Sequence, residues 1–333
     1  MKHKAEKSVS VIIAARNESI NVAGLLEKLS QQTHCDFEVI IANDRSEDDT
    51  LDILNSYTKK FGHFHHIDVS ELPDGWSGKK NAIYQGIKQA KNEVLLFTDA
   101  DCIPNSNQWI SEISNAFNPD IDIVLGLSPY QYRQGFLNKF IQFETLFTAI
   151  QFVGFTKMGK PYMGLGRNMA IRRSKYDLSL LESISDHVGG DDDLMVNALS
   201  NSKNTIVITS HQSQTQSLPE NSWGDYFKQK IRHLSAGKYY QKKDRTLLGL
   251  FTLSFLFGWI LFFTLLVSAL NPYFILTAFA LRSLSFYVIF ARLGRKLGSP
   301  INLWSVPLLD LCYSIYYPIV GLKALLTKNI QWK

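Results

Sequence analysis

The sequence predicts an α/β protein with a doubly wound, mainly parallel sheet, followed by a C-terminal transmembrane helical segment. Three observations lead to this fold class. Short β-branched and apolar runs alternate with helical patterns over residues 8–102, as in βαβ units. Several of these runs are apolar without interruption, as in strands buried on both faces of a parallel sheet. From residue 247 onward, charge almost disappears over stretches long enough to cross a bilayer.

The first elements follow in the order expected of such a domain. Buried strands are predicted at 8–15, 37–42, 66–69 and 94–98. Apolar residues recur at helical spacing after the first strand, and a glycine-containing loop, 73–80, leads into a helix that ends near residue 91. The last strand runs directly into Asp99 and Asp101. Because ligands of such sheets bind beyond the carboxyl ends of the strands, these two carboxylates mark a candidate site.

After residue 102 the pattern is less regular. Strands are predicted at 121–127 and 204–209, and residues 164–171 are predicted to form a glycine turn that leads into a short strand. Residues 189–194 are expected to open a helix, and 221–240 to form an amphipathic helical region. The segment 136–155 carries apolar residues, mostly phenylalanine, at three- and four-residue steps, with only Lys139 and Glu144 charged. We interpret this stripe as a helix that faces a core, with a helix lying in the membrane interface as the alternative.

Three apolar segments follow the predicted α/β domain. Residues 247–270 carry no charge and are long enough to cross a hydrocarbon layer of about 30 Å. A second span is expected at 273–291, with Arg282 inside it, and a third at 302–322, with Asp310 inside it. Charges are unfavourable inside a membrane, so we expect Arg282 and Asp310 to face each other. The third segment also suits a helix lying at the interface.

Basic residues indicate the orientation of these spans. They precede the first span and follow the second, at Lys238, Lys242, Lys243, Arg245, Arg292, Arg295 and Lys296. The positive-inside rule therefore places a domain formed by 1–240 in the cytoplasm, with 241–333 as a multi-pass segment of the cell membrane. The net charge of +5 is spread along the chain without a basic block, so no nucleic-acid partner is predicted.

Acidic residues are predicted to converge at one edge of the sheet. Asp44 ends the second strand, Asp99 and Asp101 follow the fourth, and Asp191 begins a later helix. Two carboxylates one residue apart can share a divalent cation with a diphosphate, because hard cations bind carboxylate and phosphate oxygens together. A carboxylate that binds no metal can accept a proton from an attacking hydroxyl. Each aspartate alone is also explained as a cap or a turn residue.

Six segments in this order resemble the family 2 glycosyltransferases, which are inverting enzymes with the GT-A fold. Residues 11–18 are similar to the first strand of the family. Residues 43–50 resemble its Asp-Asp-x-Ser-x-Asp-x-Thr segment, with Asn43 in place of the first aspartate. Residues 78–82 resemble the Gly-Lys-x-x-Ala start of a helix.

The other three segments contain the remaining acidic and basic motifs. Asp99-Ala100-Asp101 corresponds to the Asp-x-Asp motif, and Gly190-Asp191 to a Glu-Asp pair whose first member is replaced by glycine. Residues 229–233 resemble the Gln-x-x-Arg-Trp motif of processive, membrane-embedded members, with histidine in place of tryptophan.

The resemblance implies a role for each matching residue. Asp44 would bind the base of a UDP- or GDP-linked sugar, and Asp99 and Asp101 would hold its diphosphate through Mg²⁺ or Mn²⁺, with Asp101 the expected direct ligand. Asp191 would be the general base. The remaining donor-site residues would be Ala14, Arg16, Glu18 and Lys79. The residues expected to hold the acceptor or the diphosphate are Asp192, Gln229, Arg232 and His233.

The function implied is a membrane-anchored inverting glycosyltransferase that moves a sugar from a nucleotide-sugar donor to a lipid-linked or membrane-associated acceptor. Such a reaction would belong to the biosynthesis of cell-envelope glycans or glycolipids. A processive polysaccharide synthase is the first alternative, favoured by the motif at 229–233. A non-catalytic nucleotide-binding membrane scaffold is the second, although a scaffold would require neither Asp101 nor Asp191.

Overall fold

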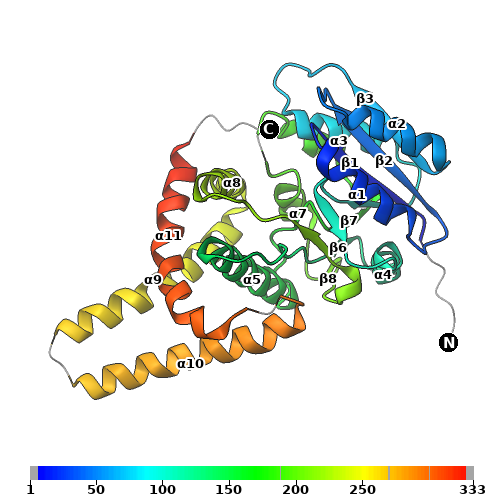
Figure 1. The fold of residues 1–333 in the computed structure, drawn as a ribbon. Helices are drawn as coiled ribbons and strands as arrows, with labels where there is room; N and C mark the ends of the chain where they lie inside the picture. The colour runs from blue at the N-terminus through cyan, green and yellow to red at the C-terminus, as the bar shows by residue number, and fades with distance from the viewer. Residues whose placement is uncertain (1–6, 188, 269–270, 300, 328–333) are drawn as a thin grey trace. The chain divides into compact units, whose positions relative to one another are not determined.

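The computed structural model describes residues 7–187, 189–268, 271–299 and 301–327. Figure 1 shows a mixed sheet with helices along the first part of the chain and long helices along the last part. The strands are β1 Val9–Ala15, β2 Phe37–Asp44, β3 Phe64–Val69, β4 Val94–Phe97, β5 Cys102–Pro104, β6 Ile123–Leu125, β7 Met169–Arg172, β8 Thr205–Val207 and β9 Thr215–Ser217. In the described part of the chain, seven strands form one sheet in the order β3-β2-β1-β4-β7-β6-β8, and β5 pairs with β9.

The predicted mainly parallel sheet is confirmed. β1 runs parallel to β2 and β4, β2 runs parallel to β3, and β6 runs parallel to β8. Only β7 opposes its neighbours β4 and β6 in this sheet, as far as the structure describes it. The carboxyl ends of β1, β2 and β4 therefore lie at one edge, beside the start of β7, where Phe97 pairs with Met169.

Helices cover both faces of the sheet, which explains why its strands are apolar without interruption. These helices are α1 Ser19–Ser30, α2 Thr50–Lys60, α3 Gly78–Gln89, α4 Trp109–Ala116, α6 Leu178–Ser183 and α7 Asp193–Leu199. Alternate residues of β1, such as Val11 and Ile13, pack in one buried cluster with Leu25 of α1 and Trp109 of α4. On the other face α3 approaches β1 closely, because a Cβ at Gly86 would lie 2.9 Å from Cγ2 of Ile12.

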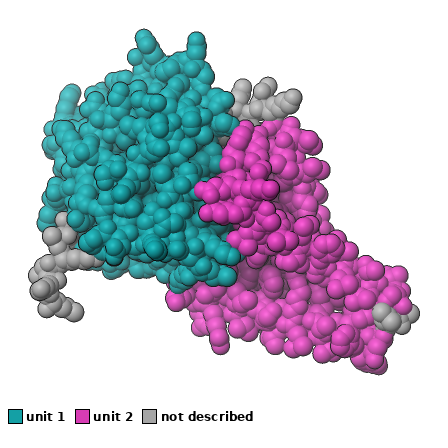
Figure 2. Space-filling view, turned by 180° about the vertical axis from the view of Figure 1, so that it is seen from behind, with its two compact units in different colours: residues 1–131, 151–218, 329–333 teal, residues 132–150, 219–328 magenta. Residues whose placement is uncertain are grey.

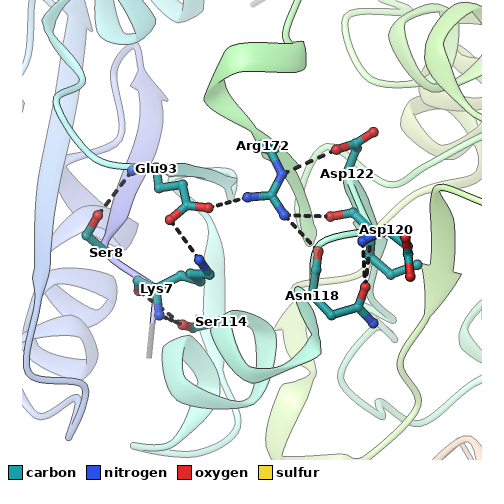
Figure 3. Close-up of polar contacts among 9 residues, drawn as sticks. Lys7, Ser8, Glu93, Ser114, Asn118, Asp120, Asp122 and Arg172 are labelled. Atoms are coloured by element: carbon teal, nitrogen blue, oxygen red, sulfur yellow. Dashed lines mark hydrogen bonds and ion pairs between the residues drawn. The ribbon is translucent and has the colours of Figure 1, made fainter. Parts of the chain in front are cut away.

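A polar network fixes the edge of the sheet opposite the carboxyl ends of β1 and β4. Arg172, at the end of β7, pairs with Glu93 just before β4 and with Asp122 just before β6, at 3.2 Å from the latter (Figure 3). Its guanidinium also donates to the carbonyl oxygen of Asn118, and Lys7 pairs with Glu93 at 3.1 Å. These contacts tie the antiparallel strand to its neighbours, at a distance from the carboxylates that follow β4.

The described chain forms two compact units, which Figure 2 colours separately. One unit contains the residues up to 131 together with 151–218, and the other contains 132–150 together with the residues from 219 to the end of the last helix. The predicted domain boundary after residue 240 does not coincide with this division and stays a prediction. The helix α5, Phe136–Lys157, contributes to both units.

The second unit is built around aromatic side chains. Its further helices are α8 Trp223–Ser235, α9 Lys242–Val267, α10 Pro272–Lys296 and α11 Val306–Leu326. Phe143 of α5 stacks on Phe290 of α10 with ring centroids 4.9 Å apart, and Phe147 lies 4.9 Å from Tyr313 of α11. The phenylalanine stripe predicted over 136–155 therefore faces a protein core.

Three helices of this unit are long and apolar enough to cross a membrane, by length and composition: α9, α10 and the segment Leu303–Leu326 that contains α11. The predicted pairing of charges inside them is confirmed, since Arg282 Nη1 lies 2.6 Å from Asp310 Oδ2. The indole Nε1 of Trp259 donates to the same oxygen at 3.1 Å. One carboxylate thus joins α9, α10 and α11.

Candidate active site

A cavity at the carboxyl ends of β1 and β4 brings together residues from five separate segments. Its lining includes Ala14, Lys79, Asp99, Gly166, Tyr176 and Asp191. Four of these were predicted as site residues from the sequence. Asp99 follows β4, Lys79 lies in the first turn of α3, and Asp191 precedes α7. The fold therefore brings Lys79 and Asp99 next to Asp191, which lies 112 and 92 residues further along the chain.

The ammonium group of Lys79 joins the two carboxylates of this cavity. Its Nζ lies 2.9 Å from Asp99 Oδ1 and 3.3 Å from Asp191 Oδ2. Burial alone lowers the pKa of Lys79, but the charges of Asp191, Asp99 and Asp192 outweigh burial and raise its pKa above the ordinary value. Lys79 is therefore a fixed positive charge between a residue of the Asp-x-Asp motif and the predicted general base.

The backbone before Asp191 explains where the sequence departs from its expected motif. Gly189 and Gly190 have φ values of 86° and 75°, a region that glycine adopts without steric strain. An acidic residue at position 190 would be strained in this conformation. Asp191 itself is 6% exposed and faces Lys79.

The neighbouring Asp192 has a different position. Its side chain accepts hydrogen bonds from the backbone N–H of Gly166 at 2.6 Å and of Asp193 at 2.8 Å, and so caps α7. Burial first, and then the charge of Asp191, raise the pKa of Asp192 to about 6. Because the side chain of Asp192 is used in this cap, Asp191 is the neighbouring carboxylate that lines the cavity. The predicted contact of Asp192 with an acceptor or a diphosphate stays a prediction.

Asp99 and Asp101 form the core of a candidate metal site. Their carboxylate oxygens and the sulfur of Cys102 all lie within 4.8 Å of one another. Two carboxylates this close together suit a hard divalent cation such as Mg²⁺ or Mn²⁺. The thiol of Cys102 is buried, and burial, followed by the charges of Asp101 and Asp99, raises its pKa. The donor set thus fits the cation that the sequence predicts.

The other residues predicted for the donor site lie near the same edge of the sheet, and two of them, Asp44 and Glu18, have partners of their own. Asp44, at the end of β2, is fully buried and pairs with Arg45 through both carboxylate oxygens, at 2.8 and 3.1 Å. The carboxylate of Glu18 accepts a hydrogen bond from Asn21 at 2.7 Å. The Nε of Arg16 is buried without a hydrogen-bond partner among the described residues. Base recognition by these residues stays a prediction.

The motif at 229–233 lies on α8, in the second unit. Gln229 donates to Oε1 of Glu220 at 3.1 Å, and both residues belong to that unit. Arg232 and His233 lie in the last turn of the helix. Their predicted contact with the acceptor or the diphosphate stays a prediction.

Sequence reasoning missed two residues near the carboxylates, Tyr176 and Arg167. Tyr176 lines the cavity, and burial together with the charges of Asp191 and Asp192 raises its pKa. The guanidinium of Arg167 lies over the ring of Tyr130, 4.4 Å from its centroid. The arginine at 167 follows a glycine in a short turn, which is a weak sequence indication of a site residue. The sequence around Tyr176 gives no such indication.

Two protein-family models match the chain. A description of glycosyl transferase family 2 matches residues 10–178, and one of glycosyl transferase family group 2 matches residues 95–292. The first covers the strands from β1 to β7 and ends at the start of α6.

Among curated proteins, the chain is similar to 4,4'-diaponeurosporenoate glycosyltransferases of Staphylococcus aureus. The enzyme of strain bovine RF122 / ET3-1 is 31% identical over 146 residues, and that of strain USA300 is 30% identical over 146 residues. In both cases the match covers 43% of this chain and 37% of the relative. The chain thus matches only somewhat more than a third of the length of these relatives.

Among solved structures, the chain resembles a mannosyltransferase from Pyrobaculum calidifontis that was determined in complex with GDP-Man and Mn²⁺. The TM-score is 0.60 at 15% sequence identity, over 94% of this chain and 88% of the other. At this identity the likeness concerns the fold, which is the GT-A type followed by apolar helices.

Proposed function

From the premise that this chain belongs to glycosyl transferase family 2, we propose that it is a membrane-anchored, inverting glycosyltransferase. It transfers a sugar from a UDP- or GDP-linked donor to a hydroxyl of a lipid-linked or membrane-associated acceptor. The observation that carries the proposal is the cavity in which Lys79 lies between Asp99 and Asp191. A carboxylate that binds the metal on the donor diphosphate and a base that deprotonates the acceptor must lie close together, and Asp99 and Asp191 pair with the same Lys79 ammonium.

The donor is held by the residues after β4 and in the first turn of α3. Asp101 and Asp99 would hold a divalent cation, which when bound would neutralise charge on the leaving diphosphate. Lys79 can donate to a phosphate oxygen, because its ammonium already lies in the cavity between two acceptors. The base of the nucleotide extends toward Ala14 and Asp44 at the ends of β1 and β2.

Asp191 performs the chemical step on the acceptor side. Its carboxylate accepts the proton of the acceptor hydroxyl while the hydroxyl oxygen forms a bond to the anomeric carbon. The bond from that carbon to the diphosphate breaks at the same time, and the electron pair leaves with the diphosphate. Attack from the opposite face inverts the anomeric configuration, and no bond between sugar and protein is formed.

Two observations support an acceptor that belongs to the membrane. Among the residues that the structure describes, three helices are long and apolar enough to cross a bilayer. The matched relatives from S. aureus are named for a diaponeurosporenoate acceptor, although the match covers only 37% of their length. We place the catalytic unit on the cytoplasmic face, because basic residues lie at the start of α9 and at the end of α10.

The second candidate function is a processive polysaccharide synthase, favoured by the motif at 229–233 on α8. Three membrane helices are few to line a channel for a growing polymer, unless chains assemble. Product length from purified protein separates the two functions, because single addition gives one glycosylated acceptor and processive addition gives a polymer.

The proposed function is tested with purified full-length protein in nanodiscs. A panel of UDP- and GDP-linked sugars is offered with membrane lipid extract, with Mg²⁺, with Mn²⁺ or with EDTA, and release of nucleoside diphosphate is measured. We expect release from one donor or a narrow set of donors, and a loss of release in EDTA. Absence of release from every donor with either cation would leave the non-catalytic scaffold as the better hypothesis.

A further inference from the structure

Next to Lys79 in the first turn of α3 stands a second lysine, with an entirely different environment. Lys80 is 0% exposed, and its Nζ donates to the carbonyl oxygen of Ile184 at 2.6 Å and to that of His187 at 2.7 Å. A buried ammonium is unfavourable unless it is hydrogen-bonded, so a lysine at this position requires acceptors fixed in place. Here both acceptors are backbone groups more than 100 residues away in the chain.

The segment that Lys80 holds leads directly to Asp191. Two further hydrogen bonds attach it to the start and middle of α3. The N–H of Ser77 donates to the carbonyl oxygen of Ser185 at 2.8 Å, and the hydroxyl of Tyr84 donates to Glu182 at 2.8 Å. Residues 182–187 are thus fastened to α3 by four hydrogen bonds, of which the two from Lys80 are buried most deeply.

Residues 188–190 lie between this fastened segment and Asp191, and two of them, Gly189 and Gly190, have positive φ values that allow the backbone to turn sharply. Glycines do not themselves restrict the position of the residue that follows them. The position of Asp191 therefore depends on what is fixed on either side, namely the segment held by Lys80 before it and the cap of α7 after it.

We infer that Lys80 is a positioning residue for Asp191, holding the carbonyl groups of Ile184 and His187 so that the general base is presented to the cavity. The inference rests on the proposed function, since it assigns Asp191 the task of a base. Adjacent lysines of α3 then act on the same carboxylate in two ways. Lys79 pairs with its side chain, whereas Lys80 fixes the backbone that leads to it.

The test compares Lys80→Met with Lys88→Met in full-length protein in nanodiscs. Methionine keeps an unbranched apolar chain but has no donor. Lys88 lies on the same helix but is exposed, with its ammonium over the ring of Tyr84, so its substitution is a matched control. The measurements are kcat and KM with the donor found in the panel, the Kd for UDP or GDP with Mn²⁺, and hydrogen exchange of the backbone.

We expect Lys80→Met to lower kcat by about ten- to a hundredfold, because small displacements of a reacting group have effects of this size. The Kd for the nucleotide should stay within about twofold, since the donor-binding residues are untouched. Backbone amides of 182–191 should exchange faster, while those of β1 and β2 should not. Lys88→Met should behave as the wild type in all three measurements.

An unchanged kcat in Lys80→Met would overturn the inference. So would faster exchange spread evenly over the sheet with kcat falling only by the unfolded fraction, because Lys80 would then serve stability alone. If Lys80→Met does not fold, Tyr84→Phe removes another tie to the same segment, and an unchanged kcat there counts against the inference. If the wild type transfers no sugar, the proposed function fails, while the exchange data still show whether Lys80 fixes 182–191.

Discussion

Lys79 and Lys80 are adjacent in sequence, yet their surroundings change their pKa values in opposite directions. For Lys79, the charges of Asp191 and Asp99 outweigh burial and raise the pKa. For Lys80, burial outweighs the charges of Asp191, Asp186 and Asp192, and lowers the pKa from 10.5 to about 8. The difference arises because Lys79 touches carboxylates, whereas Lys80 touches only carbonyl groups.

The lowered pKa of Lys80 makes the stability of the fold depend on pH. Between about pH 8 and 10.5, the unfolded chain binds a proton at this lysine that the folded chain has released, so the fold gains stability as pH rises. Below pH 8 both states are protonated, and the unfavourable burial of charge is fully present. We therefore expect the free energy of unfolding of the wild type, relative to Lys80→Met, to rise by up to about 1.4 kcal/mol per pH unit over this interval.

Thermal unfolding of both proteins between pH 7 and 10.5 checks this expectation, since all other titrating groups are common to the pair. A difference in Tm that does not change with pH would show that Lys80 keeps its ordinary pKa in the fold.

At the residue scale, the sequence predicted those site residues that lie directly at the end of a strand or the start of a helix. Asp99 could be predicted because it directly follows β4, and Lys79 because it lies in the first turn of α3. Lys80 could not be predicted, because its role depends on carbonyl groups that follow α6, and no sequence pattern reports that contact. The separation of Asp191 from Asp192 likewise required knowing which carboxylate caps α7.

Among the elements, the ion pair of Arg282 and Asp310 joins the three apolar helices α9, α10 and α11. The carboxylate of Asp310 is 3% exposed and is shared by Arg282 and Trp259. Four aromatic rings, those of Phe255, Trp259, Phe279 and Phe286, lie within 5.7 Å of the Arg282 guanidinium. Arg282 thus makes cation–π contacts with these rings and also neutralises the charge of Asp310.

We expect Arg282→Leu to lower the free energy of unfolding by about 3 kcal/mol, because it leaves a buried carboxylate without its partner. The double variant Arg282→Leu with Asp310→Leu should regain a large part of this loss, since neither charge is then buried alone. Equilibrium unfolding in mixed micelles measures both. Equal stability of Arg282→Leu and the wild type would show that the pair contributes nothing to the packing of α9, α10 and α11.

Elements with a strong periodic or apolar pattern were predicted well, and short ones less so. The strand expected at 121–127 is only Ile123–Leu125, and the helical region expected at 221–240 is α8 followed by a short 3-10 turn. The grouping of α5 and α8 with the apolar helices could not be foreseen, because aromatic contacts such as Phe140 with Tyr316 join segments far apart in the chain. The apolar pattern at 136–155 indicates that this face of the helix is buried, but it does not indicate which other helices cover it.

At the scale of the whole molecule, the basic residues make a prediction about topology. Residues at the start of α9 and the end of α10 carry the positive charge, while the connection between these helices, which includes Ser268, carries none. We expect a cysteine introduced at Ser268 to react with a membrane-impermeant maleimide in intact cells. The natural Cys35 is exposed in the first unit and should react only after the cells are opened. Protection of the introduced cysteine, or labelling of Cys35 in intact cells, would contradict the orientation.

The central claim is that Asp191 acts as the base of a sugar transfer into the membrane. The most direct measurement follows a radiolabelled sugar from its nucleotide donor into the lipid phase, with wild type and Asp191→Asn in the same nanodiscs and with nucleotide binding measured in parallel. We expect Asp191→Asn to bind UDP or GDP with Mn²⁺ about as tightly as the wild type, while transfer falls by a factor on the order of 10²–10⁴. Transfer by Asp191→Asn at a rate near that of the wild type would contradict it.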